Sequence, residues 1–295
     1  LNLMGKLCGR FKIIPKSFII QAGAVQRTDD YPVALGGFAD IWMGVYGSHD
    51  VALKVFRAYR AQRDGTLKED MKTFCREAVI WRRLRHPNIT PFHGIDDKFF
   101  PSQLALVCDW MPSGNIVEYL RMSPAANRLK LTLDMAKGLE YLHSVNIRYG
   151  DLKSMRTCPH LDNILVNKKQ TAWLTDFGLA TVYVTRMLST TSAAAGSMRW
   201  MAPELMNPEV LDLAKAEVSL QSDVYALAMV IWEVFTGKLP FQEYKPDAKV
   251  MALVLCGTRP WRPVQATPLG LSDDLGSLIQ TCWAGDRVYA QQWWT

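Results

Sequence analysis

Val51-Ala52-Leu53-Lys54 is a short apolar run that ends in a lysine. A helical pattern follows at about residues 68–84, where apolar side chains recur at helical spacing. His86-Pro87-Asn88 ends this helix, because proline disfavours helical backbone in the residue before it. A lysine at the end of a strand is ordinarily a solvated charge, but Glu77 in the middle of the helix offers this one a partner.

The rest of the chain divides into a β-rich part and an α-rich part. Short apolar runs predict strands within residues 31–107: Val33–Leu35, Ile41–Tyr46, Val51–Phe56 and Leu104–Cys108. Beyond Pro112-Ser113-Gly114 the pattern is mainly helical, with an amphipathic helix at Leu129–His143. Ser222-Asp223 as the N-cap and Gly237 at the other end bound an apolar run that predicts a buried helix. We therefore expect two lobes that meet near Pro112.

Three further motifs lie in the α-rich part. Tyr149-Gly150-Asp151-Leu152-Lys153 comes first, and Asp176-Phe177-Gly178 follows the apolar Ala172-Trp173-Leu174. Met201-Ala202-Pro203-Glu204 comes next along the chain. In the β-rich part, Val33–Ile41 contains a Gly-Gly turn between two strands, which by itself usually makes a plain hairpin. Taken singly, each motif has an ordinary explanation.

Together and in this order, the motifs resemble those of the eukaryotic protein kinase domain over about residues 31–285. The tryptophan-rich Arg199–Glu204 and Cys282-Trp283 are similar to the tyrosine-kinase-like group of Ser/Thr kinases, especially to those of mushroom-forming fungi. The resemblance implies an α+β fold, the bilobal protein kinase fold. It has a β-rich N-lobe with one main helix and a mainly α-helical C-lobe.

The same resemblance divides the chain. It implies an N-terminal extension at residues 1–29 and a protein kinase domain at residues 30–295. Within the domain it implies an N-lobe at 30–107, a hinge at 108–114 and a C-lobe at 115–295 with an atypical C-terminus.

The N-lobe and the hinge are implied to bind ATP. Val33–Ile41 resembles the Gly-rich loop that covers the phosphates, although Ala34 and Ala39 stand where the family has its first and third glycines. Lys54 resembles the V-A-I-K lysine that meets the α- and β-phosphates, where the family's helix glutamate, here Glu77, holds it. Cys108 resembles the residue at the back of the adenine pocket. The residues implied for ATP binding are Val33, Gly36, Phe38, Ile41, Ala52, Lys54, Glu77, Cys108, Asp109 and Met111.

The C-lobe is implied to carry catalysis. Phosphoryl transfer needs positioned phosphates, Mg²⁺ and an acceptor for the hydroxyl proton. By the resemblance, Asp151 is the catalytic base and Lys153 stabilises the transferring phosphate, while Asn163 and Asp176 hold Mg²⁺. Lys153, two residues after Asp151, resembles the serine/threonine type rather than the tyrosine type. The implied function is a protein kinase that transfers the γ-phosphate of ATP to Ser or Thr of a protein substrate.

The catalytic loop is longer than that of the family. Asn163 follows Asp151 by twelve residues instead of five, and without Met155–Leu161 the loop would match the family closely. This segment is either a genuine insertion or an intron translated in error. An alternative function follows from it, in which the chain is a catalytically impaired, kinase-like scaffold that binds ATP.

Two further departures concern single residues. Tyr149 and Gly150 replace the histidine and arginine of H-R-D, and that arginine normally receives a phosphate from the activation loop. We therefore expect activity that does not depend on phosphorylation of Ser189–Ser192. Near the C-terminus, Ala290 falls where the family has an arginine that pairs with the A-P-E glutamate, so we expect Glu204 to lack that partner.

The composition excludes several other classes of protein. The chain has 295 residues, 49% hydrophobic content and a net charge of +6 without a block of basic residues, so we expect no nucleic-acid partner. The longest apolar stretch, Val224–Phe235, is too short for a membrane span. Six scattered cysteines without a C-x-x-C pair favour a reducing compartment, and no signal peptide is recognisable, so we expect a cytoplasmic protein. The chain begins with Leu1 rather than Met, so we expect residues before it, and the oligomeric state stays open.

Deletion of Met155–Leu161 should raise the phosphotransfer rate tenfold or more, which is roughly 1.4 kcal/mol of barrier. The shorter loop would present Asp151 and Asn163 as one rigid unit, and a misplacement of about 1 Å can cost about 100-fold in rate. The measurement is kcat on a generic Ser/Thr substrate, with Asp151→Asn in the deletion background as the inactive control. An unchanged or lower kcat would mean that the loop tolerates or uses the segment.

Overall fold

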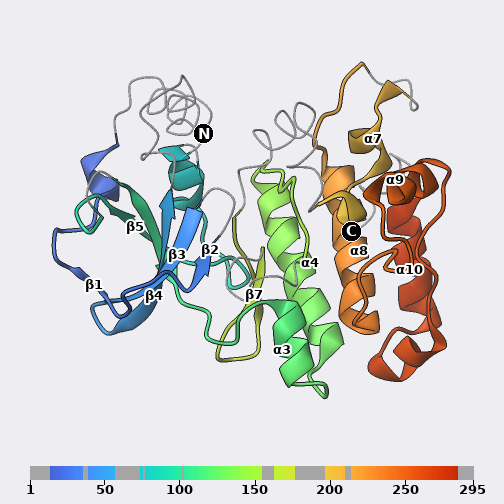
Figure 1. Cartoon of the computed structure of the whole chain (residues 1–295), viewed down its shortest axis with the longest axis horizontal. Coiled ribbons are helices and arrows are strands. Elements are labelled where there is room, and N and C mark those ends of the chain that lie inside the picture. Colours follow the sequence, from blue (N-terminus) through green and yellow to red (C-terminus); the bar gives the residue numbers. More distant parts are fainter. Residues whose placement is uncertain are drawn as a thin grey trace.

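The computed structural model describes residues 14–35, 39–56, 74–75, 77–100, 103–154, 163–176, 197–209 and 214–284. The sheet of strands β1 to β6 lies in one lobe and most helices lie in the other (Figure 1), as expected for a bilobal α+β kinase fold. Several residues named above lie outside the described ranges: Gly36, Phe38, Met155–Leu161, Phe177-Gly178, Ser189–Ser192 and Ala290.

An antiparallel sheet forms the N-lobe in the order β1-β3-β4-β6-β5, with β2 paired to β3. Its strands are β1 (Val25–Arg27), β2 (Ala34–Leu35), β3 (Ala39–Tyr46), β4 (His49–Phe56), β5 (Phe92–Asp96) and β6 (Ala105–Asp109). Alternation along β4 gives the sheet its two faces, because side chains of successive residues point to opposite sides. Val51, Leu53 and Val55 pack on the outer face, whereas Ala52 and Lys54 face the inter-lobe side.

The outer face of the sheet is covered by the segment that precedes it. A short 3₁₀ helix, η1 (Lys16–Phe18), leads to Ile20, whose backbone N–H donates to the carbonyl of Ile95 in β5 at 2.8 Å. Residues 20–25 then pass from β5 to β1, at the opposite edge of the sheet. Ile20 and Val25 are both buried in the cluster on the outer face. The sheet therefore includes residues before position 30.

One helix packs on the inner face of the sheet. Residues 74–75 and 77–81 are helical, and we call this element the Glu77 helix. Phe74 anchors it to β4 through an edge-on contact with Phe56, with 5.0 Å between the ring centroids. The predicted helix at residues 68–84 is thus confirmed in its described part and ends at residue 81.

The C-lobe is mainly helical. Its α-helices are α3 (Ile116–Met122), α4 (Arg128–Ser144), α7 (Pro203–Met206), α8 (Leu220–Thr236), α9 (Asp247–Leu255) and α10 (Asp273–Trp283). It also contains the hairpin β7 (Ile164–Val166) and β8 (Ala172–Leu174), with the 3₁₀ helices η3 (Met198–Trp200) and η5 (Val264–Leu269). No helix in the described part of the chain is both long and apolar enough to cross a membrane.

Helix α8 is the centre of this lobe and packs against both α4 and α10 (Figure 1). Residues 222–235 are all buried, which explains why its sequence is apolar on every side. The predicted N-cap at Ser222-Asp223 is wrong. Ser219 caps the helix and the Ser222 hydroxyl completes a capping box, so the Asp223 carboxylate is available for other partners. Gly237 ends the helix with φ +62°, a left-handed conformation that suits glycine.

Ile20→Ala should lower the free energy of unfolding by about 2–4 kcal/mol, because it leaves a cavity between residues 20–25 and the sheet. Leu35→Ala is the matched control, since Leu35 is 62% exposed and its loss should cost less than about 0.5 kcal/mol. Urea unfolding of both variants measures the difference. Equal effects would show that the N-terminal segment does not stabilise the sheet.

Candidate active site

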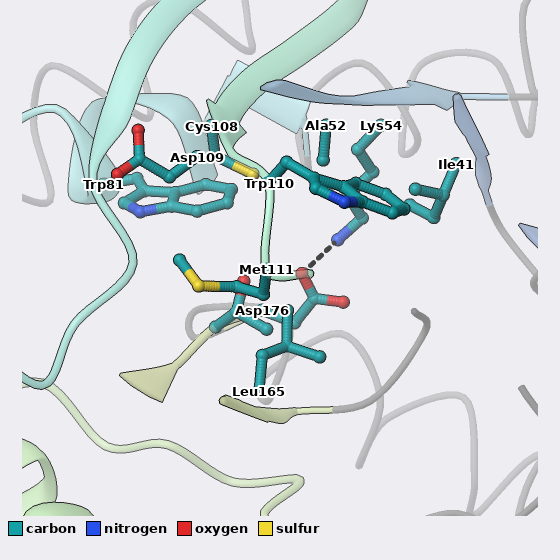
Figure 2. A pocket seen from close by; sticks show the side chains of 11 residues that line it. Ile41, Ala52, Lys54, Trp81, Cys108, Asp109, Trp110, Met111, Leu165 and Asp176 are labelled. Carbon is teal, nitrogen blue, oxygen red and sulfur yellow. Dashed lines mark ion pairs between the residues drawn. The ribbon is translucent and has the colours of Figure 1, made fainter. Parts of the chain in front are cut away.

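A pocket lies where the inner side of the sheet meets the β7–β8 hairpin (Figure 2). We call it the interlobe pocket. It is lined by Ile41, Ala52, Lys54, Trp81, Cys108, Asp109, Trp110, Met111, Leu165, Thr175 and Asp176.

Most residues that the sequence predicted for nucleotide or magnesium binding meet in this pocket. Those that line it are Ile41, Ala52, Lys54, Cys108, Asp109, Met111 and Asp176. Glu77 reaches it through Lys54. Val33 is 38% exposed and does not line the pocket, and Gly36 and Phe38 lie outside the described residues.

Four other residues that line the pocket were not among those predicted to bind the nucleotide. Trp81 has the helical spacing of a core residue, and Trp110 lies in the predicted hinge but was not singled out there. Leu165 lies in strand β7, and Thr175 directly precedes Asp176. Only the fold brings these two residues to the pocket. Burial of an indole at the wall of a pocket has no signature in a single sequence.

Lys54 links three elements in this pocket. Its ammonium nitrogen Nζ lies 3.0 Å from Oε1 of Glu77. The same nitrogen lies 2.9 Å from Oδ1 of Asp176 (Figure 2). Burial lowers the pKa of Lys54, but Asp176 and Glu77 outweigh burial and hold it above its ordinary value. Burial raises the pKa of Glu77 to about 7, against the effect of Lys54. The lysine is therefore a fixed positive charge that two acidic side chains orient.

Asp176 takes a backbone conformation that is unusual for aspartate. Its φ is +59°, in the left-handed region, and such a residue outside glycine typically costs about 1–3 kcal/mol. The preceding residue is fixed, since Thr175 N–H donates to the carbonyl of Asn163 at 3.0 Å. Lys54 then holds the turned carboxylate in the pocket.

Asp151, Lys153 and Asn163 come together below the pocket residues. Nζ of Lys153 lies 3.0 Å from Oδ2 of Asp151 and donates to Oγ of Ser197 at 2.5 Å. The side-chain amide of Asn163 donates to the backbone carbonyl of Asp151. The two ends of the long catalytic loop are thus in contact despite their separation in sequence. Ser197, which is 5% exposed, was missed because it lies outside the motifs.

Asp223 of α8 holds the start of this loop. Its carboxylate accepts hydrogen bonds from the backbone N–H of Tyr149 at 2.8 Å and of Gly150 at 2.7 Å. The ring nitrogen Nε2 of His143 lies 3.0 Å from the same carboxylate. Asp223 is 1% exposed, so these partners satisfy a charge that would otherwise be costly to bury. The backbone before Asp151 is therefore fixed by a helix in the core.

Tyr149 and Gly150 suit the conformation of the loop. The Tyr149 hydroxyl contacts the carbonyls of Asn163 and Thr175, so one buried side chain connects the loop to the residue before Asp176. Gly150 has φ +78°, where a residue with a Cβ would cost roughly 1–2 kcal/mol. Glycine at this position therefore takes the left-handed conformation without that cost.

Glu233, ten residues further along α8, holds the other side of the site. Its Oε2 accepts from the Ser154 hydroxyl at 2.5 Å and from the Trp200 indole at 3.1 Å. Ser154 is the last described residue before the long loop segment. Trp200 belongs to η3, which directly precedes Met201–Glu204. Glu204 is half-buried and is not left without a partner among the described residues. The expected lack of the family's arginine stays a prediction, because Ala290 lies outside the described ranges.

The oxygen donors near Lys54 fit a hard cation. Asp176 offers a carboxylate and Asn163 an amide oxygen, and magnesium prefers such ligands. Within the described ranges no group of three or more His, Cys, Asp or Glu side chains is arranged to hold a metal. Magnesium in nucleotide sites typically uses one or two protein carboxylates together with phosphates and water. The small protein contribution seen here is therefore compatible with Mg²⁺.

Glu77→Gln should remove part of the pH dependence of stability. Burial raises the pKa of Glu77 to about 7, above its usual 4.5, so the folded wild type binds a proton more tightly than the unfolded chain. This contribution is complete below pH 4.5 and is lost as the pH rises through 7. Between pH 5 and pH 8 the wild type should lose about 2 kcal/mol of unfolding free energy that the variant keeps. Urea unfolding without nucleotide measures this, and parallel profiles for the two proteins would contradict it.

Several known proteins are similar to this chain over most of its length. The family model described as protein tyrosine and serine/threonine kinase matches residues 30–289. Serine/threonine-protein kinase STY46 of Arabidopsis thaliana is 32% identical over 88% of this chain and 41% of its own length. Serine/threonine-protein kinase CTR1 of the same plant is 32% identical over 86% of the chain and 29% of its own length. The mouse serine/threonine-protein kinase TNNI3K is 29% identical over 92% of the chain and 30% of its own length.

The chain spans less than half the length of these relatives. Its bilobal fold brings Lys54, Glu77 and Asp176 of the family motifs together. With the family match over residues 30–289, these features lead to one conclusion: the chain belongs to the protein tyrosine and serine/threonine kinase family.

Proposed function

We propose that this kinase domain transfers the γ-phosphate of ATP to a serine or threonine hydroxyl of a protein substrate. The observation that carries the proposal is that two lysines of the family motifs are each held by fixed partners. Lys54 is held between Glu77 and Asp176, and Lys153 lies between Asp151 and Ser197. The relatives named above are serine/threonine-protein kinases, which supports the choice of substrate hydroxyl.

The interlobe pocket takes the nucleotide. Ile41 and Ala52 cover one face of the adenine and Leu165 the other, with the backbone of residues 109–111 along its edge. Lys54 meets the phosphates that are not transferred. Asp176 and Asn163 hold Mg²⁺, which when bound neutralises charge on the phosphates.

Asp151 and Lys153 act on the substrate. The carboxylate of Asp151 orients the substrate hydroxyl and accepts its proton as the oxygen–phosphorus bond forms and the bond to the leaving ADP breaks. Lys153 stabilises the negative charge of the transferring phosphoryl group. Ser197 fixes the lysine through its 2.5 Å hydrogen bond, so the positive charge is positioned before the substrate arrives.

The alternative, a catalytically impaired scaffold, rests on the long catalytic loop. The contact between the Asn163 amide and the Asp151 carbonyl supports the enzyme instead, because the loop's functional ends remain together. Lys54 and Lys153 are also both present and ion-paired, and a kinase without catalytic activity would not need both of these charges.

Lys54→Ala should weaken Mg-ATP binding at least tenfold, because among the described residues that line the interlobe pocket no other side chain supplies a positive charge. Asp151→Asn should leave this affinity within about threefold and abolish phosphotransfer, since the carboxylate acts on the substrate hydroxyl. Titration calorimetry gives the affinities and a radiolabel transfer assay gives the rate. Lys98→Ala is the matched control on an exposed lysine, and its values should equal those of the wild type. Equal affinity of the Lys54→Ala and wild-type proteins would refute the role of Lys54.

A further inference from the structure

Trp81 and Cys108 both line the interlobe pocket, and Figure 2 shows the indole beside the cysteine. The two residues come from different elements, the Glu77 helix and β6. Phe92 connects them, because it faces Cys108 across the β5–β6 pairing and its ring stacks on the indole. The Trp81 and Phe92 ring centroids are 5.3 Å apart with an interplanar angle of 21°. The indole is therefore part of the wall that Cys108 also forms.

The indole is held in place by a chain of hydrogen bonds. Its N–H donates to the carbonyl of Thr90 at 2.6 Å. The backbone N–H and the hydroxyl of Thr90 in turn donate to the carbonyl of Leu174, at 3.0 and 3.1 Å. Trp81 and Thr90 are each 1% exposed, so a rotation of the ring would leave a buried donor and a buried acceptor without partners. The wall is consequently rigid.

Cys108 leaves space that the indole fills. Burial raises the pKa of its thiol, which keeps this side chain neutral, and a thiol is small and behaves as an apolar group. A small side chain at the back of a pocket would admit a longer ligand if nothing stood behind it. Here the large indole of Trp81, from the neighbouring helix, lines the same pocket and packs in the same core cluster as Cys108. The depth of the pocket therefore depends on Trp81 rather than on Cys108.

We propose that Trp81 is a specificity-determining residue of the nucleotide pocket. Its indole closes the pocket beside Cys108, so adenine fits and an adenine with a bulky apolar group on its exocyclic amino nitrogen does not. The inference rests on the proposed function, because it takes adenine as the occupant with its edge along residues 109–111. By this proposal the Glu77 helix both carries Glu77 and, through Trp81, limits the size of the ligand.

The first test compares ATP with ATP that bears a benzyl group on the exocyclic amino nitrogen. The wild type should bind the benzyl derivative at least tenfold more weakly than ATP. Trp81→Leu should bind it at least tenfold more tightly than the wild type does, and the added substitution Cys108→Met should reverse that gain. Equal affinity of the wild type for both ligands, or no gain in Trp81→Leu, would overturn the proposal. Trp81→Met serves in the same way if the leucine variant does not fold.

The second test needs no nucleotide and uses thermal unfolding of the same proteins. Cys108→Met alone should lower Tm, because the longer side chain meets the indole, and Trp81→Leu alone should lower Tm, because it leaves a cavity. If the two side chains share one space, the loss of Tm in the double variant should be smaller than the sum of the losses in the two single variants. Additive losses would overturn the shared wall. Failure of every variant and the wild type to bind ATP would instead overturn the proposed function, whatever the Tm values.

Discussion

Asp223 accepts two backbone hydrogen bonds from residues 149 and 150, and the catalytic loop depends on them. The carboxylate stands on α8, whose residues 222–235 are all buried, so it cannot turn towards solvent. His143 of α4 pairs with the same carboxylate and holds it from the other side. Since a buried unpaired N–H costs about 1–3 kcal/mol, any other path of this backbone would be less stable. The position of Asp151, one residue later, follows from that constraint.

The same core joins the two lobes around the nucleotide. The hydrogen bonds from Trp81 through Thr90 to Leu174 connect the Glu77 helix with β8, two residues before Asp176. Glu77 and Asp176 thereby approach Lys54 from opposite lobes, and the lysine pairs with both. A displacement of the helix would separate the lysine from one carboxylate and leave a buried charge poorly compensated. The ion pairs of Lys54 with Glu77 and Asp176 therefore depend on the relative position of the two lobes.

The ordered motifs predicted the fold through their resemblance to the protein kinase domain, and the structure brings Lys54, Glu77 and Asp176 together as the resemblance implied. The residues that support them could not be found in this way. Ser197 acts through a contact with Lys153 that joins distant segments. Ser219 takes the cap that Ser222 was predicted to provide, since both serines satisfy the cap pattern and only the position of the helix decides. Strand β1 has three residues, too few for a recognisable alternation.

The measurement that tests this account most directly is the phosphotransfer rate of Asp223→Asn, with Asp274→Asn on the exposed face of α10 as the control. An amide replaces one acceptor with a donor that faces the N–H groups of residues 149 and 150, so the loop should shift while the nucleotide pocket stays intact. We expect kcat to fall about 100-fold, Mg-ATP affinity to change less than threefold and the near-ultraviolet circular dichroism to stay that of a folded protein. A folded Asp223→Asn protein with the kcat of the control would contradict the account.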